Sequence, residues 1–331
     1  MPVKNAMLLL PPGNRDRIYG ADAVAQVRQL ANLTDCADLV GDLDALRPVL
    51  AETHLILTGW GMMTLDEAFL SAAPQLEAVF YGAGSVRYFV TEEFWRRDIA
   101  LMSAWAANAV PVIEYTVAAV VFGLKRALQA AAMTREARTF RRPEGARGAY
   151  GARVGVIGVG MIGSGVLERL KSYDVETLCC DPHLADERAA ELGARPADLD
   201  EIFGTCDVVS LHAPNIPATE QMIGGRHFEL MKEGAAFINT ARGRVVNEQE
   251  MVEALEEGRI FAFLDVTDPE PPAPDSPLYV LPNVFLTPHL AGAIGDEVRR
   301  NGICVLEELK RFLAGEPLRY RVTEDMMSWM A

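Results

Sequence analysis

Cysteine, histidine and positive charge are all scarce in this chain of 331 residues. The five cysteines are an odd number, lie apart from one another except for Cys179-Cys180, and form no CxxC pair. This spacing excludes a disulfide framework and a zinc knuckle, so we expect reduced thiols, a cytoplasmic protein and no metal site. Lysine and arginine number 31 against 46 aspartates and glutamates, a formal net charge of −15. An acidic chain has no general attraction for nucleic acid or anionic lipid, so we expect neither as a partner.

Long hydrophobic runs are also missing. The apolar run at residues 6–10 is too short for a secretory signal or a membrane span. The longest run, residues 117–124, continues into Lys125-Arg126, and we interpret it as part of a buried helix. We therefore expect a soluble intracellular protein. Half of the residues are hydrophobic, which is enough for the two domains that the length favours.

Strand-like and helix-like segments alternate along the chain in two series. The first series predicts strands at 7–10, 55–58, 78–81 and 99–102, with helices at 20–33 and 65–72. The second predicts strands at 154–157, 177–180, 208–211, 236–239, 261–265 and 284–286, with helices between them and a long helix at 295–313. Between the two series, Pro111 suits the first turn of a helix that runs to about residue 133. Such alternation predicts parallel sheets flanked by helices.

The strongest local signal follows the strand expected at 154–157. The run Gly158-Val159-Gly160-Met161-Ile162-Gly163 opens the next helix with the pattern GxGxxG. Its first glycine suits a tight turn, its second a close approach to a pyrophosphate, and its third close packing of the helix on the strand. Asp181 ends the next strand, where a carboxylate binds ribose hydroxyls and repels a 2′-phosphate. The pattern therefore predicts an NAD site rather than an NADP site.

Three further polar segments follow predicted strands. Arg242 stands in a segment that begins at Asn239, Glu270 lies in a proline-rich loop that begins at Asp265, and His289 follows Thr287-Pro288. Taken singly, these residues are typical of a surface ion pair, a solvated acidic turn and a structural histidine. All three lie at the strand ends where open α/β sheets place their ligands, and this shared position favours a site.

The chain resembles the D-isomer-specific 2-hydroxyacid dehydrogenase family. The resemblance rests on motifs between residues 154 and 292, with family-like spacing: GVIGVGMIG, the Asp181 strand end, LHAP, NTARGRVVNEQEMVEAL, DVTDPEP and LTPHLAG. A glycine-rich loop in the other series, Gly82-Ala83-Gly84-Ser85, also matches the family.

The resemblance implies a role for each matching residue. Arg242 would hold the carboxylate and keto oxygen of a 2-keto acid, His289 would be the acid/base, and Glu270 would orient it. Asp265 would contact the nicotinamide carboxamide, and the backbone of Ala83 and Gly84 would bind the substrate carboxylate. The other residues expected to bind NAD are Gly158, Gly160, Met161, Ile162, Gly163, Asp181, His212, Ala213, Pro214, Thr240, Ala241, Arg242, His289 and Gly292.

The family fold implies two doubly wound α/β domains, each with a parallel sheet. A Rossmann-type cofactor domain at 104–292 would be inserted into a flavodoxin-like substrate domain at 1–103 and 293–331. The implied activity is reversible hydride transfer between NADH and a 2-keto acid that is glyoxylate-like, hydroxypyruvate-like or larger. The implied assembly is a homodimer, with the helix after Pro111 in its interface.

Some features leave alternatives open. Relatives commonly carry Asp and then Asn or His after the glycine-rich loop, whereas this chain has Val86 and Arg87, which puts the substrate in doubt. Trp60, at another strand end, either lines the substrate pocket or packs at the domain edge. A second enzyme hypothesis is a formate dehydrogenase, although the formate dehydrogenases of the family have Gln where this chain has Glu270. A dinucleotide-sensing protein, as in the corepressor branch of the family, is a further alternative.

Overall fold

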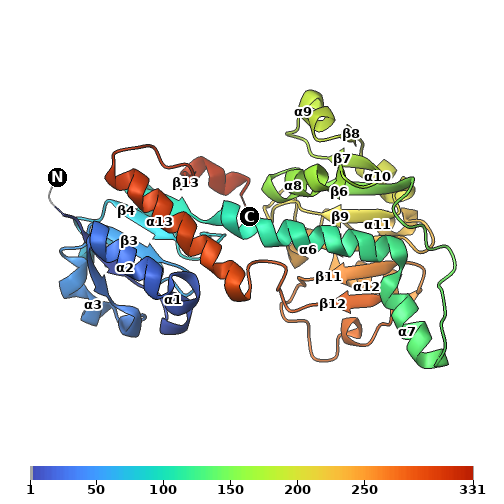
Figure 1. The fold of residues 1–331 in the computed structure, drawn as a ribbon, viewed down its shortest axis with the longest axis horizontal. Coiled ribbons are helices and arrows are strands. Elements are labelled where there is room, and N and C mark those ends of the chain that lie inside the picture. Colours follow the sequence, from blue (N-terminus) through green and yellow to red (C-terminus); the bar gives the residue numbers. More distant parts are fainter. Residues whose placement is uncertain (1–2, 331) are drawn as a thin grey trace. The chain divides into compact units, whose positions relative to one another are not determined.

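The computed structural model describes residues 3–330, and the chain divides into two compact units. Unit 1 comprises Met1–Ala109 and Ala293–Ala331, and unit 2 comprises Val110–Gly292. Each unit contains one β-sheet with helices on its faces (Figure 1). The sequence suggested a first boundary after Ser103, whereas in the structure the first boundary falls after Ala109. The reason is that a continuous helix, α6 (Trp105–Lys125), leads from one unit to the next.

Unit 1 has a six-stranded sheet in the order β13-β5-β4-β3-β1-β2. The strands are β1 (Asn5–Leu8), β2 (Asn32–Asp35), β3 (Leu55–Thr58), β4 (Ala78–Tyr81), β5 (Ala100–Ser103) and β13 (Arg321–Val322). The first five are parallel and follow the flavodoxin-like order 2-1-3-4-5, whereas β13 pairs antiparallel with β5. Strands β3 and β4 are buried along their whole length, as expected of a sheet covered on both faces.

The helices of unit 1 cover these two faces. They are α1 (Pro12–Ile18), α2 (Gly20–Leu30), η1 (Ala37–Leu39), α3 (Leu43–Leu50), α4 (Glu67–Ala72), α5 (Glu92–Trp95), η4 (Gly295–Val298), α13 (Arg299–Leu313) and η5 (Glu324–Ser328). Asp42, Asp66 and Thr91 begin α3, α4 and α5, because each side chain accepts a hydrogen bond from a backbone N–H of the first turn. Two apolar clusters result, one on each face of the sheet.

Unit 2 has a seven-stranded, wholly parallel sheet in the order β12-β11-β10-β9-β6-β7-β8. The strands are β6 (Ala152–Ile157), β7 (Val175–Cys180), β8 (Ala194–Pro196), β9 (Val208–Leu211), β10 (Ala236–Asn239), β11 (Phe261–Leu264) and β12 (Val284–Leu286). Counted from β6, six of them follow the Rossmann order 3-2-1-4-5-6, and β12 extends the sheet. The predicted fold class is confirmed. It places the carboxyl ends of β6, β9, β10 and β11 along one edge.

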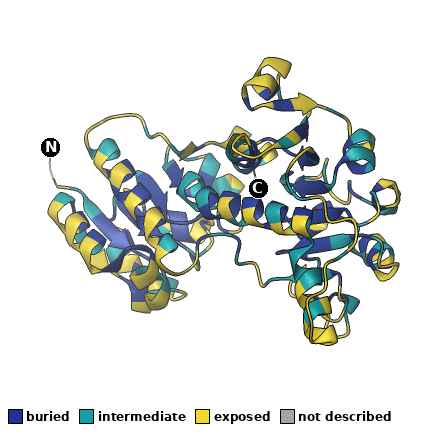
Figure 2. Cartoon of the chain, turned by 45° about the vertical axis from the view of Figure 1, so that its right-hand side comes forward, coloured by how far each residue is buried: buried dark blue, intermediate teal, exposed yellow. Residues whose placement is uncertain are grey.

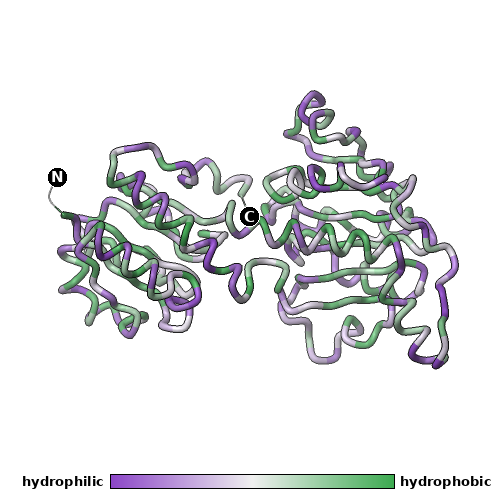
Figure 3. Tube along the Cα trace, in the orientation of Figure 1, coloured by the Kyte–Doolittle hydropathy of each residue, from purple (hydrophilic) through white to green (hydrophobic). Residues whose placement is uncertain are grey.

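The helices that accompany this sheet include the most apolar helix of the chain. They are α6, α7 (Ala127–Ala137), α8 (Met161–Leu170), α9 (Asp186–Glu191), α10 (Leu199–Thr205), α11 (Gly225–Leu230), η2 (Gly243–Val245), α12 (Glu248–Glu256) and η3 (Pro277–Tyr279). Among the described residues, α6 is the one helix long and apolar enough to cross a membrane by composition (Figure 3). Over half of that apolar window is buried in the protein, and a Cβ on Gly123 would lie 3.0 Å from that of Ala236 in β10. We therefore interpret α6 as a core helix.

Several details differ from the sequence-based expectation. Pro111 lies inside α6 rather than in its first turn, because the helix already begins at Trp105. The helix expected at 295–313 is a short 3₁₀ segment followed by α13. Strands β2 and β8 were not expected, because they are short edge strands whose side chains are mostly exposed. Figure 2 shows the burial pattern on which the sequence-based prediction of strands and helices depended: the strands are buried, and the helices are exposed on their outer faces.

Candidate active site

The glycine-rich turn lies between β6 and α8, as the motif predicted. Gly158 has a φ of +84°, and a Cβ there would lie 2.6 Å from the backbone nitrogen of Ala213. A Cβ on Gly163 would overlap the carbonyl oxygen of Gly158. Gly160 precedes α8 with open space beside it and no side-chain cap on the helix. Free N–H groups at an uncapped helix start, facing open space, fit the pyrophosphate of a dinucleotide.

Asp181 follows β7 and is bonded to the glycine turn. Its Oδ2 accepts a hydrogen bond from the N–H of Val159 at 2.7 Å, and its Oδ1 accepts one from the N–H of His183 at 2.8 Å. The carboxylate therefore holds the first glycine turn against the end of β7. This contact adds a structural role to the predicted one in ribose binding.

His212 begins the loop after β9, beside the glycine turn. Its Nε2 lies 2.9 Å from the hydroxyl of Ser210, and its Nδ1 is buried with no partner among the described residues. Burial lowers the pKa of His212 to about 3, so the ring is neutral at pH 7. Ala213 is buried and Pro214 is half-buried in the same loop. An unpartnered ring nitrogen beside the glycine turn is consistent with the predicted contact to a bound group.

The loop after β10 is organised by Asn239. The side-chain oxygen of Asn239 accepts a hydrogen bond from the N–H of Ala241 at 3.0 Å, and its amide donates to the carbonyl of Arg242 at 3.1 Å. The hydroxyl of Thr240 lies 3.2 Å from that of Thr116 in α6. The loop is thus fixed before any ligand binds, which suits a residue that must present its side chain in one direction.

Arg242 is a half-buried cation without a carboxylate partner. Its Nη1 donates to the carbonyl of Ala241 at 2.6 Å, and no ion pair joins its guanidinium to any described residue. Burial lowers the pKa of Arg242, and the negative charge of Glu270 opposes this effect. Because arginine stays charged in proteins, the free N–H groups of this guanidinium can bind an anion, most favourably a carboxylate held by two parallel bonds.

His289 and Glu270 form a hydrogen-bonded pair. The Nδ1 of His289 lies 2.6 Å from Oε1 of Glu270, and both side chains are partly exposed, at 46% and 42%. His289 has a φ of +49°, an uncommon backbone conformation for a residue other than glycine. Its N–H donates to the carbonyl of Asp265 at 3.0 Å. Because Glu270 occupies Nδ1, Nε2 is left to exchange a proton with a ligand.

Asp265 holds the loop that carries His289. Its buried carboxylate accepts hydrogen bonds from the hydroxyl of Thr287 at 2.6 Å and from the N–H groups of Leu290 and Ala291, both at 2.8 Å. The hydroxyl of Thr287 donates its one proton to Asp265, so the hydroxyl of Tyr115, 2.9 Å from that of Thr287, must be the donor between these two. Sequence reasoning missed Thr287 and Tyr115. The predicted contact of Asp265 with a nicotinamide stays a prediction.

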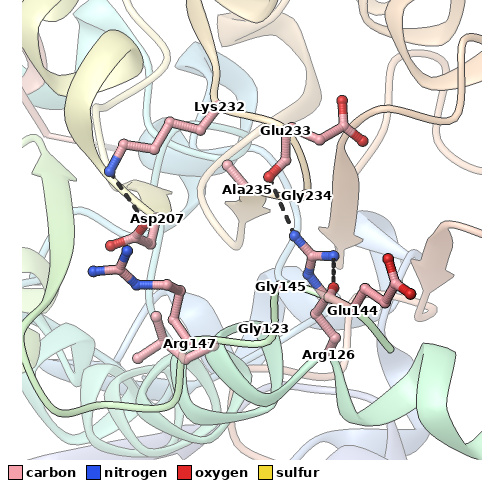
Figure 4. Close-up of a pocket in the computed structure, with 11 residues that line it drawn as sticks. Gly123, Arg126, Glu144, Gly145, Arg147, Asp207, Lys232, Glu233, Gly234 and Ala235 are labelled. Carbon is pink, nitrogen blue, oxygen red and sulfur yellow. Dashed lines mark hydrogen bonds and ion pairs between the residues drawn. The ribbon is translucent and has the colours of Figure 1, made fainter. Parts of the chain in front are cut away.

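Two pockets open in unit 2. A pocket of about 650 Å³ adjoins the pair of His289 and Glu270, and its rim carries the partly exposed rings of Tyr279 and Phe285. A second, of about 470 Å³, lies at the opposite, amino ends of β9 and β10 (Figure 4). Three of its six charged side chains, those of Arg126, Asp207 and Lys232, bond to the protein. Lys232 contacts Asp207 at 3.1 Å, and Arg126 donates to the carbonyls of Glu144 and Glu233. We assign the candidate site to the carboxyl ends of the strands.

Met161 and Ile162 begin α8 after the glycine turn, and Gly292 is the last residue of unit 2. The predicted residues Trp60, Ala83 and Gly84 lie in unit 1, after β3 and β4. Among residues 3–330, no acceptor takes the N–H groups of Ala83 or Gly84, whereas the hydroxyl of Ser103 contacts both of their carbonyls. These free amides suit the predicted binding of a carboxylate. Trp60 packs against the apolar clusters on both faces of the sheet, with the guanidinium of Arg17 6.0 Å from its ring. These contacts leave both predicted roles of Trp60 open.

Comparison with known proteins gives the family. Residues 117–291 match the model of the "D-isomer specific 2-hydroxyacid dehydrogenase, NAD binding domain". A D-3-phosphoglycerate dehydrogenase of Archaeoglobus fulgidus is 30% identical over 259 residues, which are 78% of this chain and 49% of that protein. A glyoxylate reductase of Korarchaeum cryptofilum is 32% identical over 76% of this chain and 77% of its own length.

Solved structures agree on the fold. A D-mandelate dehydrogenase of Rhodotorula graminis superposes with a TM-score of 0.81 at 21% identity, over 98% of each chain. This chain spans about half the length of the phosphoglycerate dehydrogenases that it matches. The family model covers the glycine turn, Arg242, Glu270 and His289, and it identifies the region that binds NAD. The chain belongs to the D-isomer-specific 2-hydroxyacid dehydrogenase family.

Proposed function

We propose that this protein is an NAD-dependent D-2-hydroxyacid dehydrogenase. It would interconvert a 2-keto acid and the corresponding D-2-hydroxy acid. The observation that carries the proposal is the half-buried guanidinium of Arg242, which has no carboxylate partner among the described residues. Burial lowers its pKa, and the negative charge of Glu270 opposes this effect. A protein retains such an unpaired buried cation at a cost, and an anionic substrate would offset that cost.

The chain's own residues would do the following. Arg242 would bind the carboxylate of the substrate and polarise its keto oxygen. In unit 1, the N–H groups of Ala83 and Gly84, which have no acceptor among residues 3–330, are donors of the kind that suits a carboxylate. The glycine turn would hold NADH, whose chemistry when bound would be to supply a hydride to the keto carbon. His289 would donate the proton on Nε2 to the keto oxygen. Glu270 would accept a hydrogen bond from Nδ1–H of His289 and so hold the ring in the orientation and tautomer that this transfer needs. In the oxidation direction, the same nitrogen would accept the proton of the hydroxyl group.

The substrate would be a 2-keto acid of glyoxylate or hydroxypyruvate size, or larger. The names of the relatives support a panel rather than a single compound, because they include a glyoxylate reductase and phosphoglycerate dehydrogenases. The panel is glyoxylate, hydroxypyruvate, 3-phosphohydroxypyruvate and bulkier 2-keto acids, each assayed with NADH and with NADPH. Turnover of at least one of them with NADH supports the proposal. Binding of NADH without turnover of any would favour a dinucleotide sensor, and oxidation of formate with NAD would favour a formate dehydrogenase.

We also propose that the protein is a homodimer. Large apolar side chains are exposed on α6, α7 and the segment that follows them, namely Phe122, Met133 and Phe140. The resemblance to the family implies a dimer interface that includes the helix after Pro111, and Phe122 on α6 would be available to such an interface. Light scattering coupled to gel filtration measures the mass directly, and a monomer at micromolar concentration would contradict this proposal.

A further inference from the structure

Arg87 directly follows the glycine-rich loop of unit 1, where this chain departs from its relatives. The structure gives its guanidinium three hydrogen bonds to backbone carbonyls more than 200 residues away in sequence. Its Nε donates to the carbonyl of Met330 at 2.9 Å, and its Nη2 donates to the same carbonyl at 2.6 Å and to that of Met327. Met327 lies in the last turn of η5, and Met330 lies two residues beyond its end.

Met327 and Met330 also pack against the apolar cluster to which Ala83 and Val86 belong, and Val86 is only 2% exposed. Residues 323–330, which we call the strap, are therefore attached to this part of unit 1 in two ways. Their carbonyls accept hydrogen bonds from Arg87, just after the glycine-rich loop, and their methionines join the apolar cluster that includes Ala83 of the loop.

Ser103 links the loop to the segment that leads into the strap. Its backbone N–H donates to the carbonyl of Tyr320, just before β13, and its hydroxyl contacts the carbonyls of Ala83 and Gly84. The carbonyls of Ala83 and Gly84 are thus held from one side, while the N–H groups of these two residues have no acceptor among residues 3–330. A loop whose carbonyls are fixed presents its amides in one orientation, which preorganises them for a carboxylate.

We propose that the strap sets the affinity of the glycine-rich loop for the substrate carboxylate, and that Arg87 is the positioning residue that fastens it. Arg87 acts through the loop and does not contact the substrate, because its fork is occupied by Met327 and Met330. This proposal rests on the proposed function only for its substrate. The contacts that it invokes lie wholly within unit 1.

The first test uses the full chain with no substrate. Hydrogen–deuterium exchange is followed in peptides that cover residues 82–88 for wild type, Arg87→Met and Arg87→Lys. The proposal expects exchange in this loop to be about tenfold faster or more in Arg87→Met, and between the two in Arg87→Lys, which keeps the charge but loses the fork. Arg96→Met is the matched control, because Arg96 is exposed and pairs only with Glu92 and Glu93 of its own helix. Unchanged exchange at 82–88 in Arg87→Met would overturn the proposal whether or not the protein is a dehydrogenase.

The second test separates positioning from direct contact. With the best 2-keto acid of the panel, Arg87→Met is expected to raise the KM of the keto acid about fivefold or more, with kcat within about twofold and the KM of NADH unchanged. The double variant Met327→Ser/Met330→Ser, which weakens the strap and keeps the arginine, should raise the same KM. Adding Arg87→Met to it should raise the KM little further, because both changes release one contact. Fully multiplicative effects, or a lower melting temperature with an unchanged KM, would overturn the positioning role.

Discussion

Replacement of Arg242 by alanine tests the proposed function most directly. The guanidinium donates one hydrogen bond to the carbonyl of Ala241, which leaves its remaining N–H groups for a ligand. A carboxylate bound by two charge-assisted hydrogen bonds gains roughly 1.5–3 kcal/mol from each, so about 3–6 kcal/mol is at stake. Water that fills the space recovers part of this energy. We therefore expect kcat/KM to fall at least about a hundredfold, or roughly 2.7 kcal/mol.

The assay for Arg242→Ala is steady-state reduction of a 2-keto acid, with NADH binding measured separately by fluorescence. The affinity for NADH should fall much less than kcat/KM, because the glycine turn, which is expected to hold the pyrophosphate, lies on other elements. Arg244→Ala is the matched control. Arg244 stands two residues away, is 63% exposed, and makes a long 3.6 Å ion pair with Asp268, so its loss should cost little. A loss below about fivefold in Arg242→Ala, or an equal loss in Arg244→Ala, would refute the assignment of Arg242 as the carboxylate clamp.

Three further predictions concern the pair, the cofactor and the supporting aspartate. Glu270→Gln removes the charge 2.6 Å from Nδ1 of His289, so kcat of keto-acid reduction should fall about tenfold or more while NADH binding persists, and His289→Ala should abolish most activity. An unchanged kcat in Glu270→Gln, with a substrate isotope effect showing that chemistry limits the rate, would contradict this role. Wild type should prefer NADH over NADPH, and Asp181→Asn should narrow the preference. Asp181→Ala should also weaken NADH binding, because it removes the hydrogen bond that holds the glycine turn. Equal kcat/KM for NADH and NADPH in wild type would disprove the role of Asp181 in cofactor choice. Asp265→Asn turns an amide toward buried donors and should lower the free energy of unfolding by about 2 kcal/mol, as measured by denaturant titration. Unchanged stability would show that the network around Asp265 contributes little.

The fold and the site could be predicted from the sequence to the extent that they are local or follow from the rules of parallel sheets. The strands 55–58, 78–81, 208–211 and 236–239 have the predicted bounds, because buried parallel strands are short apolar runs bounded by turn residues. The partly exposed edge strand 284–286 also has its predicted bounds, because all three of its residues are apolar. The glycine turn was readable because each of its glycines has a steric reason. Edge strands such as β8 were not readable, because exposed short strands lack that apolar signal.

What the sequence determined by itself was the chemistry at the strand ends. Arg242 follows β10 and His289 follows β12, the two strands that flank β11, and parallel strands bring their carboxyl ends to one edge. Only the tertiary structure decided which groups support them. The three hydrogen bonds on Asp265 and the attachment of Arg87 to Met327 and Met330 join segments far apart in sequence. Such partners are chosen by the packing of the whole chain. The sequence could therefore mark Arg87 as a departure from the family, but not show that its charge is bound to the protein's own backbone.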